Sequence, residues 1–215
     1  MSKDIRIKKG LNIRLQGAAE KQIANAPRSR TYNIRPADFH LITPKMAVKE
    51  GAKLQAGDDI FYNKANEAMR FLSPVSGTLK EIRRGAKRVI TNVIIEADPE
   101  DSYRDLGGLT TNAMTAESVK DKLLTGGCWA FIKQRPYDII ANPDVRPKAI
   151  FISGLNTAPL SADYDFILEG KTEAIQAAVN GLKHLTDGDI HVSVGKSSNS
   201  VFKSIEGIQL HSVTG

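Results

Sequence analysis

The stretch from Pro44 to Glu96 reads PKMAVKEGAKLQAGDDIFYNKANEAMRFLSPVSGTLKEIRRGAKRVITNVIIE, and it decides the fold of the first half of the chain. Short runs of β-type residues alternate in it with glycine-containing turns at Val48–Gly51, Leu54–Asp58, Ser73–Gly77 and Ile82–Gly85. Glycine suits such turns because it adopts a positive φ without steric cost. We therefore predict a small barrel over residues 40 to 97. Its glycines Gly51, Gly57, Gly77 and Gly85 should lie in turns, at least two of them with positive φ.

This pattern resembles the flattened barrel of lipoyl and biotinyl modules, which share a V-x-E-G turn, a following G-D and a turn like S-P-V-S-G. Such modules carry a lysine for covalent attachment at an exposed hairpin tip. Here the segment Glu67–Phe71 imitates the biotinyl E-A-M-K-M, with Arg70 at the acceptor position and Lys64 outside the motif. A guanidinium is not a nucleophile at cellular pH. A carrier of the biotinyl type is therefore kept as an alternative function.

Composition indicates a soluble globular chain in a reducing setting. Its 215 residues are 41% hydrophobic and 25% charged, which allows one large domain or two small ones. No apolar run approaches the ~18 residues that a membrane span needs. The N-terminus has no apolar signal region. The single cysteine, Cys128, excludes an internal disulfide, and we expect it to be a packed thiol.

Basic residues gather in two places, and they favour an acidic partner. The first group precedes Pro36 and consists of Lys3, Arg6, Lys8, Lys9, Arg14, Lys21, Arg28, Arg30 and Arg35. The second surrounds Gly85 and includes Arg83, Arg84, Lys87 and Arg88, which we name the basic docking face. No aromatic residues interleave with either group, so nucleic acid is not the expected partner. A solvated surface, an anionic membrane and an acidic protein partner remain as interpretations.

The first hundred residues are predicted to be β-rich throughout. Residues 5 to 15 alternate apolar and polar side chains, which indicates a half-buried strand, a turn and a second strand. Gln16–Asn33 reads as a loop, and Phe39–Ile42 as a strand that enters the barrel. We predict a domain boundary after residues 97–101, which gives a barrel-sandwich domain over 1–100 and a second domain over 101–215.

The second domain is predicted to be Rossmann-like. A helix should begin at the N-cap Thr115 and end at Gly126-Gly127. The run Ala149–Ile152 is typical of a strand buried on both faces of a parallel sheet. A helix over Ile175–Leu185, strands at Ile190–Val194 and Ile208–Val213, and a short helix at Asn199–Ile205 complete the unit. The chain stops at Gly215 directly after a strand, which suggests part of a longer protein.

No catalytic or metal-binding constellation is visible. Gly195-Lys196-Ser197 lacks the preceding glycine of a phosphate-binding loop, since Ile190 stands in its place. Asp163 and Asp165 have no third ligand nearby, so we expect a capping or surface role. The four histidines are scattered. We name no catalytic, cofactor-binding or metal-binding residue.

Several stretches along the whole chain resemble the NqrA family, which supplies one of the subunits of the bacterial sodium-translocating NADH:quinone oxidoreductase. They are Arg6–Leu11, the barrel stretch, Phe131–Tyr137, Pro147–Ser153 and Thr157–Phe166. The resemblance implies a peripheral subunit on the cytoplasmic side of the bacterial inner membrane, attached to membrane-embedded subunits of a sodium pump. The complex takes electrons from NADH, passes them through flavins and iron–sulfur centres on other subunits, and reduces ubiquinone. Members of the family are longer than this chain.

The same resemblance implies that this chain binds no cofactor, has no independent activity and has a quinone-related role. Trp129, Phe131 and Arg135 are our candidates for a quinone or subunit contact, and core aromatics beside a solvated arginine are the other interpretation. Flavin-bearing relatives place a long glycine-rich loop where this chain has Gly126–Phe131. We expect Trp129 and Phe131 to fill the space of a flavin, so the chain should bind neither flavin nor NADH. A basic binding module without a redox role is the remaining alternative.

Overall fold

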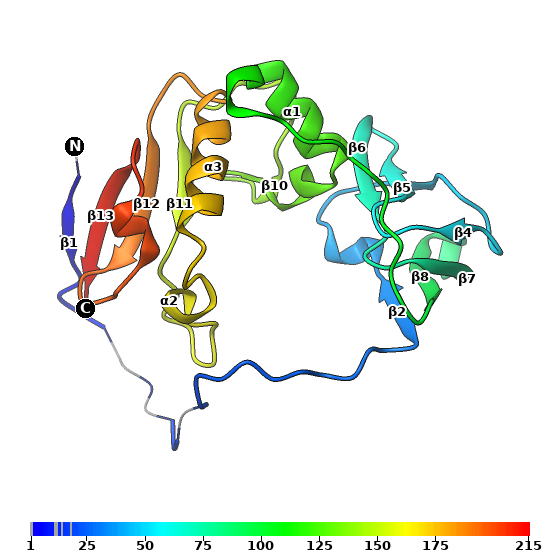
Figure 1. Cartoon of the computed structure of the whole chain (residues 1–215), viewed down its shortest axis with the longest axis horizontal. Helices are drawn as coiled ribbons and strands as arrows, with labels where there is room; N and C mark the ends of the chain where they lie inside the picture. The colour runs from blue at the N-terminus through cyan, green and yellow to red at the C-terminus, as the bar shows by residue number, and fades with distance from the viewer. Residues whose placement is uncertain (1, 11–12, 14, 18) are drawn as a thin grey trace. The chain divides into compact units, whose positions relative to one another are not determined.

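The computed structural model describes residues 2–10, 13, 15–17 and 19–215 (Figure 1). They form two compact units. One unit consists of residues 25–109 and 120–145, and we call it the barrel unit. The other consists of residues 1–24, 110–119 and 146–215, and we call it the α/β unit. These bounds differ from those of the domains predicted at 1–100 and 101–215, and that division of the sequence stays a prediction.

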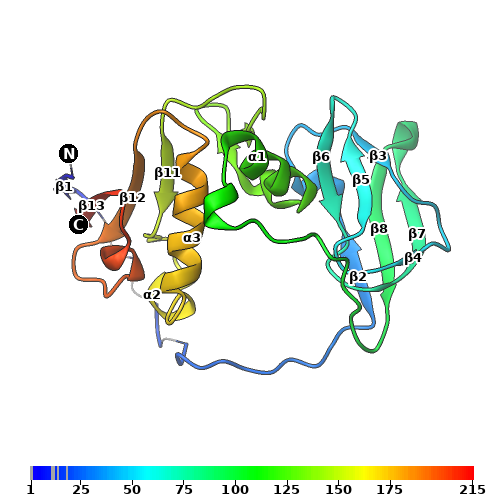
Figure 2. The same cartoon turned by 45° about the horizontal axis from the view of Figure 1, so that its top comes forward.

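The barrel unit contains two antiparallel sheets, which Figure 2 shows side by side. The first sheet has the order β2 (Thr31–Ile34), β8 (Ile90–Ala97), β7 (Gly77–Arg84) and β4 (Lys53–Leu54). The second has the order β3 (Pro44–Met46), β5 (Asp59–Asn63) and β6 (Asn66–Leu72). The predicted class, a β-rich barrel-sandwich module followed by an α/β unit, is confirmed.

The core of the barrel unit is apolar and tightly closed. Phe61, Leu79, Val93 and Ile95 have no exposed surface at all. Ile60 is equally buried, although it is next to Phe61 in β5. An irregularity in the β5–β6 register between Asp59 and Phe61 breaks the alternation of the strand, which lets both neighbours point inward.

The glycine turns follow the prediction in part. Gly51 and Gly57 lie in turns with φ of 85° and 98°, which confirms two positive-φ positions. Gly77 instead begins β7, and the turn predicted at Ile82–Gly85 lies later, between Gly85 and Val89. A single 3-10 turn, η2 (Ala86–Arg88), occurs there, and the segment from Val75 to Ile95 contains no α-helix.

Two predictions for the segment before the barrel are wrong. Phe39–Ile42 forms a turn after η1 (Pro36–Asp38), because Leu41 has a φ of 59° that a strand does not allow. The predicted loop Gln16–Asn33 ends in β2, which pairs with β8. The strand was missed because Tyr32 and Ile34 are its only apolar residues and half of each strand face is exposed.

Helix α1 (Ala116–Thr125) begins and ends as predicted. The Thr115 hydroxyl accepts a hydrogen bond from the Ser118 amide at 3.1 Å, and Gly127 follows with a φ of 70°. Next come η4 (Cys128–Phe131) and a small hairpin of β9 (Lys133–Gln134) and β10 (Ile139–Ile140). Cys128 is exposed, so the prediction of a packed thiol is wrong.

The α/β unit has one parallel sheet in the order β1 (Asp4–Arg6), β13 (Gln209–Thr214), β12 (Ile190–Gly195) and β11 (Ile150–Ser153). The crossover helix α3 (Thr172–Lys183) lies along one face of this sheet (Figure 1). Its core centres on Val179, Ile190, Val192 and Val194. The remaining elements are η3 (Thr111–Ala113), α2 (Tyr164–Ile167) and η5 (Val201–Ser204), the last at the predicted short helix.

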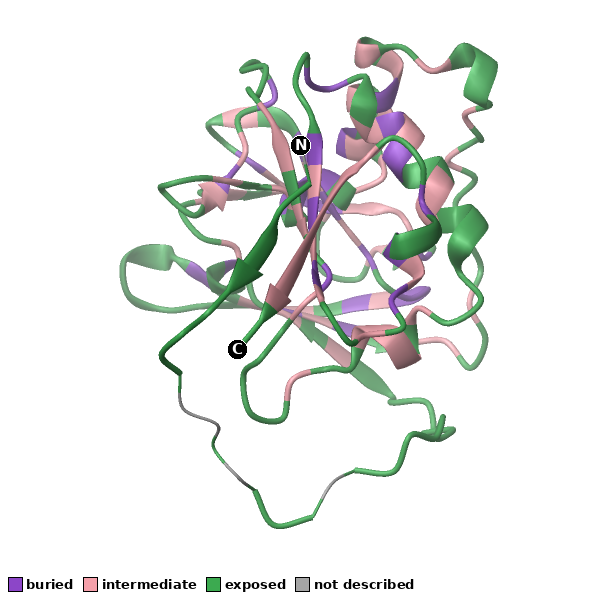
Figure 3. Ribbon diagram, turned by 90° about the vertical axis from the view of Figure 1, so that its left-hand side faces the viewer, coloured by how far each residue is buried: buried purple, intermediate pink, exposed green. Residues whose placement is uncertain are grey.

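Two strands of this sheet differ from expectation. β11 is an edge strand, and Phe151 on it is 76% exposed, so the strand is not buried on both faces. β1 pairs with β13 instead of joining the barrel, and all three of its residues are exposed (Figure 3). The second strand predicted within residues 5–15 falls on positions outside the described residues. No helix among the described residues is long and apolar enough to cross a bilayer.

Candidate functional site

The basic docking face occupies the tip of the β7–β8 hairpin. Arg83 and Arg84 end β7, and Lys87 and Arg88 lie in the connection that the Gly85 amide closes on the Val89 carbonyl at 2.8 Å. Lys87 and Arg88 have φ angles of 53° and 61°, in the left-handed region that non-glycine residues rarely adopt. The structure thus brings all four predicted residues into one short segment, and each of them is exposed.

Only one of these four cations has an anionic neighbour among the described residues. The Arg83 guanidinium lies 3.0 Å from a Glu81 oxygen, and this hydrogen bond raises the pKa of Arg83 and lowers that of Glu81. Arg84 donates to the Arg88 carbonyl at 3.2 Å. No carboxylate in the described part of the chain forms an ion pair with Arg84, Lys87 or Arg88. Their charge is left for a partner or for solvent.

The predicted contact residues Trp129, Phe131 and Arg135 lie on or just after η4, but they do not share one environment. Trp129 is buried, and its indole N–H donates to the Ala141 carbonyl at 2.7 Å. Phe131 is 76% exposed, so it does not fill an interior space as we expected. Arg135 is exposed and lies 3.6 Å from Asp138.

Phe131 is the exposed end of a series of aromatic rings in the barrel unit. It meets Phe39 edge-on at 6.4 Å, and Phe39 meets Phe71 at 4.6 Å. Phe71 in turn stacks on the fully buried Phe61 at 4.7 Å. Core rings thus hold a surface ring in place, which gives any contact at Phe131 a rigid base.

The segment that imitates a biotinyl tip is not at a tip. Glu67–Phe71 lies inside β6, where Met69 is buried and Arg70 reaches Asp59 at 3.5 Å and the Tyr62 ring at 5.2 Å. The turn of the β5–β6 hairpin is formed by Lys64 and Ala65. The prediction of the tip at Glu67–Phe71 is therefore wrong, because the strand begins one residue before the motif.

A pocket that sequence reasoning missed lies beside this hairpin. It has a volume of about 290 Å³, and its walls come from the turn after η1, from β5 and β6, and from the segment after β10. Asn63 lines it and is 93% buried, with a relative exposure of 7%. The Asn63 carbonyl oxygen accepts from the amides of Thr43 and Ala65, each at 3.2 Å. No sequence signal marks it, because its walls come from segments that lie far apart in the chain.

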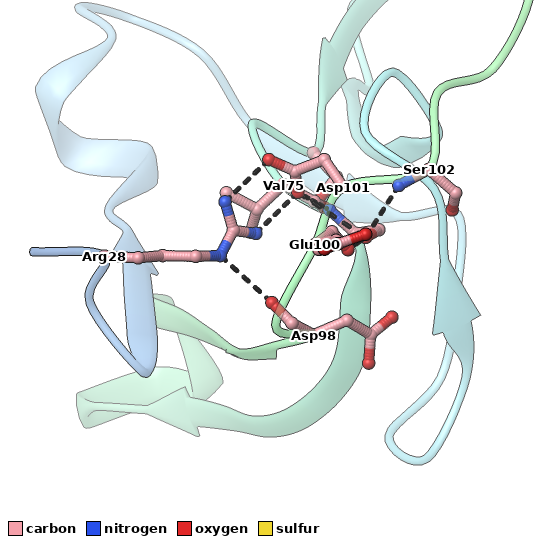
Figure 4. Close-up of polar contacts among 8 residues, drawn as sticks. Arg28, Val75, Asp98, Glu100, Asp101 and Ser102 are labelled. Carbon is pink, nitrogen blue, oxygen red and sulfur yellow. Dashed lines mark hydrogen bonds and ion pairs between the residues drawn. The ribbon is translucent and has the colours of Figure 1, made fainter.

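An ion pair ties the start of the barrel unit to the segment after its last strand (Figure 4). Both guanidinium nitrogens of Arg28 lie within 2.7 Å of the Asp101 oxygens, and the Arg28 Nε donates to the Asp98 carbonyl. Asp101 also accepts from the Ser76 amide at 2.8 Å. The hydrogen bond from Arg28, followed by that from Ser76, lowers the pKa of Asp101 to about 2. These contacts are structural.

The α/β unit shows no constellation for cofactor chemistry among its described residues. Asp163 caps α2 by accepting from the amides of Asp165 and Phe166, as the predicted capping role requires. No group of three or more metal-ligating side chains occurs in the described part of the chain. The sequence did not reveal that Phe151, His191 and His211 stack across three strands, with the two histidine nitrogens 2.9 Å apart.

Comparisons with known proteins cover nearly the whole chain. Residues 5–98 match the model of the NqrA N-terminal barrel-sandwich hybrid domain, and residues 114–215 match that of the NqrA second alpha/beta domain. The NqrA protein of the Na(+)-translocating NADH-quinone reductase from Yersinia pseudotuberculosis is 34% identical over 190 residues. That alignment covers 87% of this chain and 42% of the relative.

Two further relatives carry the same name. The protein from Tolumonas auensis is 34% identical over 197 residues, which cover 90% of this chain and 44% of the relative. The protein from Pseudomonas aeruginosa is 32% identical over 183 residues, which cover 84% and 41%. The chain thus spans less than half the length of these relatives. Since both domain models match in order and over most of the chain, it belongs to the NqrA family of the Na(+)-translocating NADH-quinone reductase.

Proposed function

We propose that this chain is a peripheral subunit of a sodium-pumping NADH–quinone reductase and docks on its partners through the basic docking face. Family membership supports the complex, since the relatives are named for it. The single observation that carries the docking role is the hairpin tip, where Arg84, Lys87 and Arg88 have no anionic neighbour among the described residues. An acidic surface of a membrane-embedded subunit is the partner that fits.

Exposed charges of this kind act mainly through attraction over a short range. They steer association and fix orientation, and salt screens them within a Debye length of about 8–10 Å. Docking that depends on the hairpin should therefore weaken steeply as salt rises. The left-handed backbone at Lys87 and Arg88 belongs to an exposed turn, so the two side chains are available to a partner.

Charge reversal tests this role. The double variant Arg84→Glu/Lys87→Glu should lose co-purification with the other subunits at a salt concentration where the unaltered protein remains bound. Lys49→Glu/Lys133→Glu is the matched control, because it makes the same change in net charge at two other residues of the same unit. Equal retention of the two double variants at every salt concentration would count against the hairpin.

The proposal also includes the cytoplasmic side of the bacterial inner membrane, the absence of a bound cofactor and a quinone contact near Phe131. The exposed ring of Phe131, held by Phe39 and accompanied by the exposed Arg135, supports a contact with a planar apolar group. Trp129 supports the segment from behind through its hydrogen bond to Ala141. Phe131→Ala should raise the quinone KM of the assembled complex without releasing the subunit, whereas loss of assembly would assign Phe131 to a subunit contact.

One observation favours a carrier of the biotinyl type as a second candidate. Lys64 lies at the turn of an exposed hairpin in a barrel-sandwich fold, where the sequence motif alone did not place it. The intact mass of the protein from its native host decides this. An added mass that Lys64→Arg removes would establish a carrier, and a mass equal to that of the sequence would exclude it.

A further inference from the structure

We propose that the pocket lined by Asn63 binds a small neutral molecule with a carbonyl oxygen, which accepts a hydrogen bond from the Asn63 side-chain amide. The proposal does not depend on the docking role. It begins from an imbalance in the hydrogen bonds of Asn63. The oxygen of this side chain accepts two backbone N–H groups, from Thr43 and Ala65. The nitrogen has only the Met69 sulfur, 3.9 Å away, among the described residues.

The orientation of the amide is fixed by these neighbours. If the oxygen and nitrogen were exchanged, the NH₂ group would face two N–H donors, and both backbone amides would lose their acceptor. The nitrogen must therefore face the opposite side of the residue with two hydrogens to donate. A thioether is a weak acceptor, and it can take one of them at most.

A buried donor without a proper acceptor is costly, so native proteins rarely leave one unless a ligand or water completes it. Asn63 is 93% buried and lines the pocket, as does its neighbour Met69, at 4% exposure. The site therefore offers a hydrogen-bond donor in an apolar setting. An acceptor oxygen on an apolar body matches both features.

The remaining walls define the class of ligand. Ile42, Met69, Ile140 and Pro143 supply apolar surface, and the polar His40 and Asp144 on the wall segments are both exposed. A volume of about 290 Å³ lies at the lower end of the range of ligand pockets, which suits a single ring. The described lining includes no lysine or arginine, so a carboxylate or phosphate would enter without a permanent counter-charge.

Two probes of the same shape test the proposal on the full chain. Acetophenone carries a carbonyl, and α-methylstyrene replaces that C=O with C=CH₂. Transfer from water favours the hydrocarbon, so a preference for the ketone must come from a hydrogen bond in the pocket. We expect acetophenone to bind about tenfold more tightly, which corresponds to about 1.4 kcal/mol.

The readout is a titration followed by ¹H–¹⁵N NMR, in which the side-chain NH₂ of Asn63 gives its own pair of signals. The Asn63→Asp variant identifies this pair. It also keeps the oxygen that accepts from Thr43 and Ala65 while removing the donor. The preference for acetophenone should disappear in this variant. Asn66→Asp is the matched control, since Asn66 also lines the pocket and accepts from the Ala68 amide. The preference should remain there.

Three results would overturn the proposal. They are equal or tighter binding of α-methylstyrene, saturation by acetophenone that leaves the Asn63 NH₂ signals unmoved, and no binding of either probe at millimolar concentration. If Asn63→Asp fails to fold, the Asn63 signals of the unaltered protein still decide between these results. A benzoate titration provides the last arm, and binding as tight as that of acetophenone would reject a neutral ligand.

Discussion

The close approach of β7 to β8 at Gly77 makes a quantitative prediction for the substitution Gly77→Ala. A Cβ atom at Gly77 would lie 2.2 Å from the Glu96 carbonyl oxygen and 2.9 Å from the Ala97 Cα. Ordinary contacts of a Cβ begin at about 3.4 Å, so the two strands must separate by roughly 1 Å or more at this point. Both neighbours are backbone atoms, and no side chain can rotate to make room.

The cost follows from the position of Gly77 in the fold. It pairs with Ala97 at the start of β7, close to the fully buried Ser76 and Leu79. Overpacking of this kind costs about 1–3 kcal/mol, and the backbone clash places Gly77→Ala at the upper end. The lower entropy of the unfolded alanine chain offsets about 0.4–1 kcal/mol. We expect a net loss of about 2 kcal/mol and a decrease in Tm of roughly 4–8 °C.

Thermal unfolding followed by the fluorescence of Trp129 measures this loss, because Trp129 is the single tryptophan and is buried in the same unit. Gly108→Ala is the matched control. An added Cβ at Gly108 has no atom within 4 Å, and the residue does not have a positive φ. Its Tm should stay the same or rise slightly. If the two variants unfold within 1 °C of each other, as roughly ±0.5 kcal/mol would allow, the reasoning about strand separation is refuted.

Three further predictions concern single groups. The pKa of Asp101 is lowered to about 2 by Arg28 and Ser76, so its contribution to stability is fully present above the unfolded pKa, near 4, and is lost as pH falls toward 2; urea unfolding at pH 5, 3 and 2 should show a larger acid loss for the unaltered protein than for Asp101→Asn. Cys128 is exposed, so native protein should react with one equivalent of a thiol reagent before any unfolding, and a delay until denaturant is added would contradict its placement. The purified chain should be colourless, and calorimetry with FMN or NADH should give no saturable heat, whereas a stoichiometric flavin would make this an electron-entry subunit.

Local signals in the sequence predicted the elements that depend on local physics. The N-cap at Thr115, the left-handed Gly127 and the turn at Gly51 each need a particular residue type at one position, and the sequence shows it directly. The exposed hairpin of the basic docking face follows from the same kind of signal, since four cations around one glycine are unlike a buried strand. Hence helix α1 and this hairpin were identified close to their observed bounds.

Features that depend on pairing between distant segments were beyond such signals. β11 has the composition of a central strand, but its place at the edge of the sheet follows from which strands pair with β12, and this exposes Phe151. β1 pairs with β13 more than 200 residues later, and no local pattern distinguishes that partner from the barrel. The pocket at Asn63 likewise requires the segment after β10 to pack beside the β5–β6 hairpin.

The β5–β6 hairpin shows how a short motif can mislead about chemistry. The letters E-A-M-R-F suggested a modified tip, but side chains in a strand alternate between its two faces, so Met69 and Phe71 point into the core and Arg70 points out toward Asp59 and Tyr62. A residue held in the middle of a strand, between an ion pair and an aromatic ring, cannot swing on a flexible tip. The two-residue turn at Lys64 and Ala65 is the part of this hairpin that has that freedom. Any carrier chemistry in this unit must therefore be sought at Lys64, whatever residue occupies position 70.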